Sequence, residues 1–438
     1  MASAPAPATQ KPQPPAAEQA LGLGAYLTST AGIGGHLRHE PEDFRVIELG
    51  DGPRPKEDGR FTAARIRLRN WETNRFAGQA TRRMKLRRGS VGFAGLKDKR
   101  AVTEQWFTFK CPADRLDRLA DLQDVEVLES YRAAQGQFAG AHDGNRFILR
   151  VRGHDTAPDA ATVEATLDEI RQAGGVPNYF GPQRFGGGFR PITHLVGAAM
   201  VRGDLEEAVR LYVGHPMEGE REDTHAARMI YEETRDPEAA LAAFPEALDP
   251  ERGILQRLVK RPDEWRYALH ALPRNLLQLF IHADQSFHFN HIITARLDAG
   301  LGLNEAHIGD QVMPVDADGT QTHAVTAANQ ARIQKELDRG RAVLTAPLVG
   351  MDCPAAAGEP GEIEAKVLEA HGVEPRDYRL REMPEQASAG RRRGLLQPVG
   401  DLAASWVDGD PELSFALGRG AYATVVMREV MKGEAGSY

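Results

Sequence analysis

The sequence predicts an α+β protein in which helices pack on a mixed, mainly antiparallel sheet. Several segments alternate apolar and polar residues, as half-buried strands do. Helical segments follow strands without the strict alternation of a doubly wound fold. Basic composition and strand-like patterns, found in the first half, occur again near the C-terminus, after a long helix-rich stretch whose first part is acidic. We therefore expect one domain that is interrupted by a long insertion.

The first half supplies most of the predicted strands. A strand begins in PEDFRVIEL, where Phe44, Val46 and Glu48 share one face. In RFTAARIRLRNW, apolar residues alternate with three arginines on the open face, Arg65, Arg67 and Arg69. The basic segment NRFAGQATRRMKLRRGS reads as a helix that ends at Gly89, since glycine is a common helix stop. TEQWFTFK and NRFILRVRG are further strands, and DAATVEATLDEIRQAGG is an amphipathic helix.

The middle and the end of the chain differ in the secondary structure that their sequences predict. NLLQLFIHADQSFHFNHIITARLDAG predicts a long helix, and IGDQVMPVDADGTQTHAVT predicts short strands and turns. PELSFALGRG and AYATVVMREVM indicate a strand, a glycine-rich turn and a closing helix. The prediction begins with a disordered Ala/Pro-rich tail, residues 1–24. The main domain follows in two parts, 25–190 and 390–432, with the insertion, 191–389, between them. Residues 433–438 form a short C-terminal tail.

Composition limits the class of protein. The net charge of −8 argues against indiscriminate nucleic-acid binding. However, residues 60–110 carry 14 Lys/Arg against three carboxylates, a stripe that would attract phosphate. No apolar run is long enough to cross a bilayer, and the N-terminus lacks the pattern of a signal peptide. Two isolated cysteines are typical of a reducing cytoplasm, and a monomer is the default expectation.

Motifs for the commonest cofactors are absent from the sequence. It has neither a dinucleotide-binding nor a P-loop fingerprint, and neither H-E-x-x-H nor G-x-S-x-G. His282, His288 and His291 fall in one predicted helix without a completing ligand, so surface or core-edge histidines are the better interpretation. We expect a reaction that needs no cofactor and no metal.

Asp98 in FAGLKDKRAVTEQWF is the leading candidate for chemistry. A solvated turn with self-compensating charges would be the usual interpretation of such a K-D-K sequence. Here small residues and Phe93 precede it and a core strand follows it, which suits a partly buried turn. An aspartate is already ionised at neutral pH, and nearby cations keep it so. It can therefore act as a nucleophile without a partner base.

Five segments together resemble the tRNA pseudouridine synthase D (TruD) family, in order and in approximate spacing: PEDFRV, GFAGLKDKRAVTEQWF, HDGNRF, VPNYFGPQRFG and GRGAYATVVMRE. The resemblance runs from about Gly32 to Met431. It implies a pseudouridine synthase catalytic domain with a TRUD-type insertion domain. It also implies an enzyme that isomerises a uridine of tRNA, at position 13, to pseudouridine without cofactor or metal. The family's nucleophile corresponds to Asp98. Whether that carboxylate attacks the sugar, attacks the base or promotes a glycal stays open.

The resemblance also implies a uridine pocket lined by Phe44, Asn145, Phe147 and Tyr422, with Arg38 paired to the nucleophile. Aromatic faces can stack on a base, and an amide can both donate to and accept from a uracil edge. Phe147 has no hydroxyl, so water or the nucleophile would take the C5 proton. Taken alone, the two phenylalanines would more often be core residues, and Asn145 would be a turn residue.

Other basic and polar residues are candidates for binding RNA. Lys97 is expected either to contact substrate phosphate or to solvate the turn. Candidates for RNA contacts, which are equally interpretable as solvated or structural residues, are Arg82, Arg83, Lys85, Arg87, Arg88, Gln183 and Arg184. Two alternatives remain: a non-catalytic RNA-binding protein on the same fold, and a glycosidase in which Glu104 is the nearest second carboxylate.

Overall fold

The computed structural model describes residues 12–154, 157–186 and 190–434, and within them the chain forms two compact units. The sheet unit holds Thr28–Val176 and the C-terminal part from Gln397. The helical unit holds Gln13–Leu27 and Pro177–Leu396. Beyond Leu27, where the chain enters the sheet unit, it passes between the units after residues 176 and 396, whereas the sequence prediction placed these two points at 190 and 389. A long-range contact explains the first difference, because the Phe180 N–H donates to Asn290 and the Phe180 ring packs against Phe289, both on the long helix of the helical unit.

Within the predicted N-terminal tail, residues 13–24 are folded onto the helical unit. Residues 1–11 lie outside the described residues, but a short helix α1 (Ala16–Gln19) follows them. Leu21 and Leu23 are buried, and the Leu21 carbonyl accepts a hydrogen bond from Asn290. Apolar residues after the Pro-rich stretch therefore anchor this segment to the helical unit.

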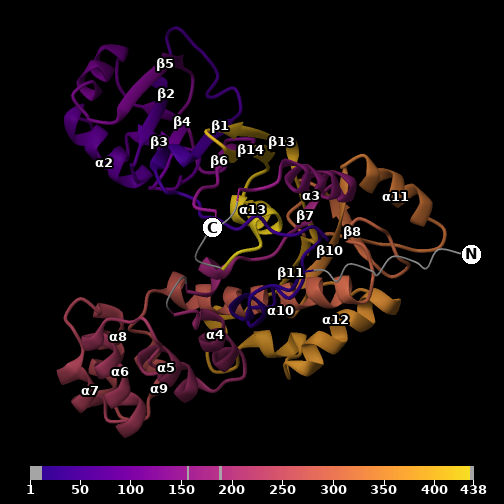
Figure 1. Cartoon of the computed structure of the whole chain (residues 1–438). Coiled ribbons are helices and arrows are strands. Elements are labelled where there is room, and N and C mark those ends of the chain that lie inside the picture. Colours follow the sequence, from indigo (N-terminus) through magenta and orange to yellow (C-terminus); the bar gives the residue numbers. More distant parts are fainter. Residues whose placement is uncertain (1–11, 155–156, 187–189, 435–438) are drawn as a thin grey trace, which may run out of the picture. The chain divides into compact units, whose positions relative to one another are not determined.

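The sheet unit is built on an eight-stranded sheet (Figure 1). Its order is β13-β14-β6-β1-β4-β2-β5, with β3 added beside β4. Only β1 and β4 run parallel among the described pairs, so the predicted mixed, mainly antiparallel sheet is confirmed. The strands are β1 (Phe44–Leu49), β2 (Phe61–Arg69), β3 (Val91–Phe93), β4 (Val102–Phe109), β5 (Val125–Ala133), β6 (Gly144–Arg150), β13 (Gly400–Val407) and β14 (Asp410–Leu417).

Helices of the sheet unit are α2 (Thr73–Arg83), α3 (Ala160–Ala173) and α13 (Ala423–Met431). Helix α2 begins at Glu72, whose carboxylate accepts the first free backbone N–H groups. It ends at Arg83 and not at Gly89, because Lys85 already has a left-handed backbone with φ +54°. The Phe76 ring lies 4.8 Å from Phe107, which packs α2 against one face of the sheet.

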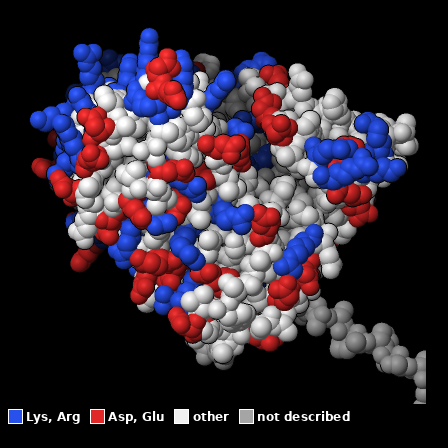
Figure 2. Space-filling view, turned by 90° about the horizontal axis from the view of Figure 1, so that it is seen from above, with Lys and Arg blue, Asp and Glu red and all other residues white. Residues whose placement is uncertain are grey.

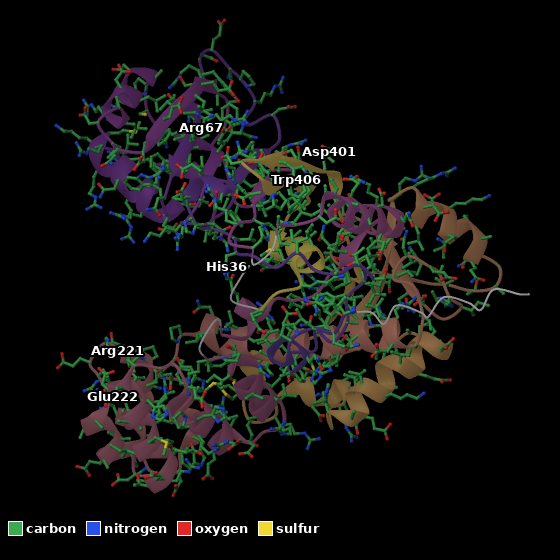
Figure 3. The ribbon with its side chains drawn as sticks, in the orientation of Figure 1. His36, Arg67, Arg221, Glu222, Asp401 and Trp406 are labelled. Carbon is green, nitrogen blue, oxygen red and sulfur yellow. The ribbon has the colours of Figure 1, made fainter. Side chains whose placement is uncertain are left out.

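The other face of β2 carries the three predicted arginines, but each of them is paired. Arg67 (Figure 3) contacts Glu104 at 2.9 Å and Glu126 at 2.7 Å. Arg65 also contacts Glu104, and Arg69 pairs with a carboxylate that precedes β1. This part of the predicted positive stripe is therefore neutralised within the sheet unit.

The helical unit contains the long helix α10 (Arg274–Asp298), which has the predicted length (Figure 1). Many of its side chains are buried. A four-stranded sheet accompanies it in the order β11-β10-β8-β9. Its strands are β8 (Gln311–Pro314), β9 (His323–Ala324), β10 (Ala342–Leu348) and β11 (Arg391–Gly394). The other helices are α4 (Thr193–Val201), α5 (Leu205–Val213), α6 (Glu222–Thr234), α7 (Pro237–Ala243), α8 (Asp249–Lys260), α9 (Trp265–Leu269), α11 (Gln330–Asp338) and α12 (Gly358–Ala370). Two short paired strands, β7 (Gly175–Pro177) and β12 (Leu396–Pro398), contain the chain crossings.

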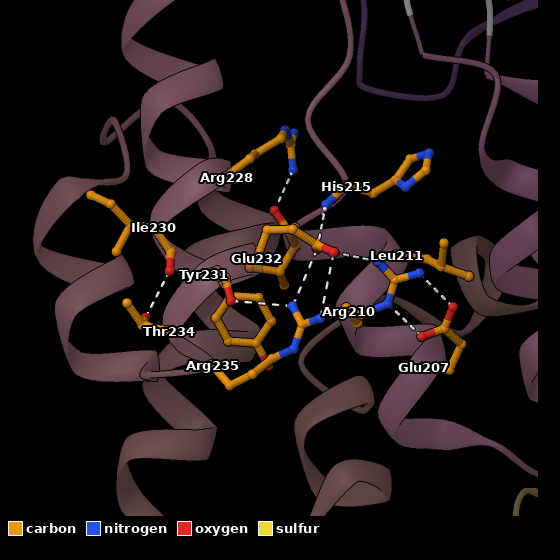
Figure 4. A network of polar contacts seen from close by, with 12 residues as sticks. Glu207, Arg210, Leu211, His215, Arg228, Ile230, Tyr231, Glu232, Thr234 and Arg235 are labelled. Carbon is orange, nitrogen blue, oxygen red and sulfur yellow. Dashed lines mark hydrogen bonds and ion pairs between the residues drawn. The ribbon is translucent and has the colours of Figure 1, made fainter.

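The acidic stretch of the helical unit is internally compensated in α5 and α6 (Figure 4). Arg210 binds Glu207 and Glu232, and Arg235 also binds Glu232. Burial opposes ionisation of Glu232, but hydrogen bonds from Arg235, the His215 N–H and Arg210 together lower its pKa to about 2. No helix in the described part of the chain is both long enough and apolar enough to cross a membrane.

Candidate active site

The loop that carries Asp98, residues 94–101, connects β3 to β4 and is fixed by side chains and backbone from three directions. The Gly140 N–H donates to the Ala94 carbonyl at 2.8 Å. The Gln105 amide donates to the Gly95 carbonyl at 3.2 Å, and the Lys97 N–H donates to Thr73 Oγ1 at 3.0 Å. A loop without regular structure is thereby held in a defined position just before Asp98.

Lys97 anchors this loop from below. Its ammonium lies 2.9 Å from Glu48, and the two side chains are only 3% and 1% exposed. The second Glu48 oxygen accepts the Trp106 N–H at 3.2 Å. The sequence left open whether Lys97 contacts phosphate or solvates the turn. The structure shows instead a buried ion pair, because the Glu48 side chain points to the inner face of β1.

Asp98 itself stays accessible. Its side chain is 48% exposed, and its nearest cation is Arg38, at 3.4 Å. The Arg38 guanidinium also lies 3.9 Å above the Phe44 ring, which fixes its orientation. Burial lowers the pKa of Arg38, and the charge of Asp98 partly offsets that effect. The predicted pairing of Arg38 with Asp98 is thus present in this structure.

The segment that carries Arg38 is positioned by the sheet. His36 (Figure 3) forms an isolated bridge with Arg152, through backbone hydrogen bonds of 2.7 and 3.0 Å. Arg38 follows with a left-handed backbone, φ +59°, which turns its side chain back toward Phe44. A positive φ at a residue other than glycine is uncommon, and here it accompanies the contact to Asp98.

Phe44 and Phe147 are buried in a row of rings. Phe147 packs edge-on to Phe44, at 6.3 Å between centroids, and stacks on Phe415 at 5.7 Å. Because Arg38 covers Phe44, neither of the two predicted pocket phenylalanines offers a free face to a base. Phe44 lies beneath Arg38 and Phe147 packs against Phe44, which agrees with the interpretation of each as a core residue.

Asn145 and Tyr422 are reached through strand pairing. Asn145 lies opposite Glu48 on β1 and opposite Leu417 on β14. The preceding Gly144 has φ +146°, and a Cβ there would lie 2.2 Å from the Leu417 carbonyl, so only glycine permits this approach. The Asn145 Oδ1 atom is buried without a hydrogen-bond partner among the described residues. Such an atom carries an energetic cost that a bound ligand can remove.

Tyr422 is the open aromatic residue of the set. It is the N-cap residue of α13, five residues beyond the end of β14, and its side chain is exposed. The structure therefore joins Arg38, Asp98 and Phe44 by direct contact. Pairing of β6 with β1 connects Asn145 to them, and Tyr422 follows β14, which pairs with the other edge of β6.

The predicted basic candidates separate into two groups. Five residues at the end of α2 and in the following turn are exposed, and none forms an ion pair with a described carboxylate: Arg82, Arg83, Lys85, Arg87 and Arg88. In Figure 2, Lys and Arg side chains crowd the left edge of the view, the side on which Figure 1 draws α2. Gln183 is exposed in the helical unit, where Arg184 binds Ser286 at 3.1 Å and lies over Phe180.

Sequence reasoning missed Glu48, Thr73, Gln105 and Gly140, the residues that hold the Asp98 loop. A carboxylate on the apolar face of a predicted strand was the one available signal, since a buried charge requires a partner. Glu104, the nearest carboxylate for a glycosidase, is engaged by Arg65 and Arg67. Among the described residues, no group of three or more His, Cys, Asp or Glu side chains is arranged to hold a metal ion.

Solved structures identify the class of this fold. The crystal structure described as a tRNA pseudouridine synthase D (TruD) from Methanosarcina mazei matches with a TM-score of 0.90 and 36% identity, covering 97% of this chain and 99% of that one. The fold is therefore that of a pseudouridine synthase, an isomerase.

Sequence comparisons define the family. The family model for tRNA pseudouridine synthase D (TruD) matches residues 20–430. A relative of that name from Methanosarcina acetivorans is 36% identical over 434 residues, covering 95% of this chain and 97% of the relative. One from Halobacterium salinarum is 41% identical over 436 residues, with the same coverage. The chain belongs to the tRNA pseudouridine synthase D family.

Proposed function

We propose that the protein converts a uridine of tRNA, at position 13, to pseudouridine, with Asp98 as the nucleophile. The observation that carries this proposal is the accessible Asp98 carboxylate, 3.4 Å from Arg38, on a loop that buried contacts hold in place. Membership of the family supports the reaction, and the resemblance of the Asp98 motif supports the residue. The target position rests on that resemblance alone.

The reaction is redox-neutral. The N1–C1′ bond of the uridine breaks, the base rotates, and C5 forms a bond to the same C1′. C5 loses its proton, and N1 gains one. A carboxylate that is ionised at neutral pH can assist glycosidic-bond cleavage without a general base. The Arg38 guanidinium, 3.4 Å from the Asp98 carboxylate, holds it in place through an ion pair.

Other residues recognise the base, which must leave its stack to be reached. The unpartnered Asn145 Oδ1 is suited to accept the N3–H of uracil. Cytosine has an acceptor at N3, so the same contact would favour uracil over cytosine. Tyr422 has an exposed ring on which the extruded base can stack.

The decisive test is Asp98→Asn, which removes the charge and keeps the size. Tritium release from [5-³H]uridine-labelled tRNA measures the loss of the C5 proton, and filter binding measures affinity. We expect Asp98→Asn to abolish release and to bind tRNA nearly as wild type does. Asp58→Asn is the matched control, since Asp58 is also exposed and lies 3.4 Å from a lysine of the same unit. Wild-type turnover by Asp98→Asn would refute the nucleophile assignment, and the absence of pseudouridine with the wild-type protein would favour the non-catalytic alternative.

A further inference from the structure

Large apolar side chains are exposed around the candidate active site. Leu96, two residues before Asp98, is 65% exposed, and Phe138 in the loop between β5 and β6 is 62% exposed. With Tyr422, at 51%, they place an exposed apolar or aromatic side chain on three loops, those after β3, β5 and β14. Leaving such surface in water is unfavourable, so its concentration at a site indicates a binding function.

Gly140 connects these three loops. Its N–H donates to the Ala94 carbonyl of the Asp98 loop at 2.8 Å, and its carbonyl accepts from Arg419 of the Tyr422 loop at 2.9 Å. The loop of residues 134–143, which we call the rim loop, therefore lies between the other two. Within the rim loop, the backbone N–H of Gln137, next to Phe138, donates to the Thr108 hydroxyl of β4. This bond fixes the start of the segment that carries Phe138. None of the family segments includes Phe138.

Charge around the rim loop favours a phosphate-bearing partner. Lys99, Arg100 and Arg419 are all exposed beside Leu96 and Tyr422, and none forms an ion pair with a described carboxylate. Arg100 and Arg419 donate to backbone carbonyls, those of His39 and Gly140, so their charges are not neutralised. Exposed apolar side chains on the same loops as such cations suit a single-stranded or locally opened nucleic acid, because bases stack on the apolar groups and cations meet the backbone.

We propose that Phe138 and Leu96 bind the bases that flank the target uridine, filling the space that the extruded base vacates. This inference rests on the proposed function. Extruding a uridine removes its stacking partners on both sides, and an inserted apolar side chain replaces part of what is lost. The two residues are placed for this role because one lies on the Asp98 loop and the other on the loop bonded to it.

The first experiment compares kcat/KM for pseudouridine formation in a tRNA stem-loop. Phe138→Ala and Leu96→Ala should each lower it about tenfold, and Phe138→Trp should restore it, because stacking needs only an aromatic face. Trp406→Ala is the matched control. Trp406 (Figure 3) is also an exposed aromatic residue, but it pairs with Pro411, at the end of the β13–β14 hairpin opposite Leu417. A loss with Trp406→Ala equal to that with Phe138→Ala would overturn the proposal.

The second experiment tests the contact itself. The stem-loop is prepared with an abasic site on the 5′ or the 3′ side of the target uridine, in the Asp98→Asn background, and affinity is measured. On one of these RNAs, Phe138→Ala should lower the affinity less than threefold, because the base that Phe138 would contact is already missing. A full tenfold loss on both abasic RNAs would show that Phe138 does not stack on a flanking base. A change of oligomeric state with Phe138→Ala in light scattering would assign the patch to a protein interface instead.

The two proposals fail in different ways. If the proposed function is wrong, the wild-type protein forms no pseudouridine in any stem-loop. If only the further inference is wrong, wild type still forms pseudouridine and Asp98→Asn does not, while Phe138→Ala either matches wild type or gives one of the overturning results above.

Discussion

Replacing Glu48 by alanine should destabilise the sheet unit strongly. The change leaves the Lys97 ammonium, 3% exposed, without its carboxylate and removes the acceptor of the Trp106 N–H. Breaking a buried ion pair by removing one partner costs about 3–5 kcal/mol in the free energy of unfolding. Most natural domains have only about 5–15 kcal/mol in total. We therefore expect Glu48→Ala to lower the urea midpoint substantially.

Urea unfolding followed by the fluorescence of the sheet unit's tryptophans is a suitable assay. Glu57→Ala, an exposed glutamate of the same unit, should change the free energy of unfolding by less than about 0.5 kcal/mol. The double variant Glu48→Met with Lys97→Met should recover most of the stability, because apolar residues replace the pair without leaving a buried charge. It should nevertheless form pseudouridine more slowly, since the ion pair that fixes residue 97 beneath Asp98 is then missing. A Glu48→Ala variant within about 1 kcal/mol of wild type would refute this reasoning.

Two further results are expected. Replacing four unpaired arginines by alanine should reduce the slope of log K against log salt for tRNA binding by up to about 3. These four are Arg82, Arg83, Arg87 and Arg88. In contrast, Arg67→Ala should leave the slope unchanged, because carboxylates already neutralise the Arg67 charge. An unchanged slope in the quadruple variant would exclude this surface from the RNA path. In the helical unit, burial lowers the pKa of His194 to about 4, although Asp284 opposes this and His288 adds to it. An unfolded histidine binds its proton below about pH 6.5, so the unfolded state gains protons that folded His194 does not bind, and stability is lost as the pH falls from about 6.5 to 4. The free energy of unfolding should fall by about 3 kcal/mol over this range. The fall should be smaller in His194→Phe, which keeps the ring stack on Phe287. Equal pH dependence in the two proteins would contradict this prediction.

Local patterns were sufficient to predict most elements. The alternation in β2 identifies both of its faces, because the side-chain period of a strand depends on no distant residue. Helix α3 ends at Gly174, in the left-handed conformation that a glycine stop predicts. The Asp98 loop was also recognisable, since small residues and a following core strand are local features.

Properties that depend on distant residues were not predictable in this way. The division of the chain after residue 176 reflects the binding of Phe180 to Asn290, 110 positions later. The covering of Phe44 by Arg38 depends on a left-handed backbone that no glycine or asparagine signals. The role of Lys97 depends on Glu48, on another strand, so its sequence neighbours alone left open whether it contacts phosphate or solvates the turn.

Pairing determines where an acidic protein can bind RNA. The arginines of β2 are numerous in the sequence, yet carboxylates of β4, β5 and the segment before β1 engage them. A paired guanidinium must give up its carboxylate before it can meet a phosphate, so it contributes little to counterion release. The unpaired cations of the sheet unit instead lie at the end of α2, in the turn that follows it, and on the loops around Asp98. The RNA path should therefore follow these unpaired cations to the accessible carboxylate, rather than the arginine-rich strand that dominates the sequence.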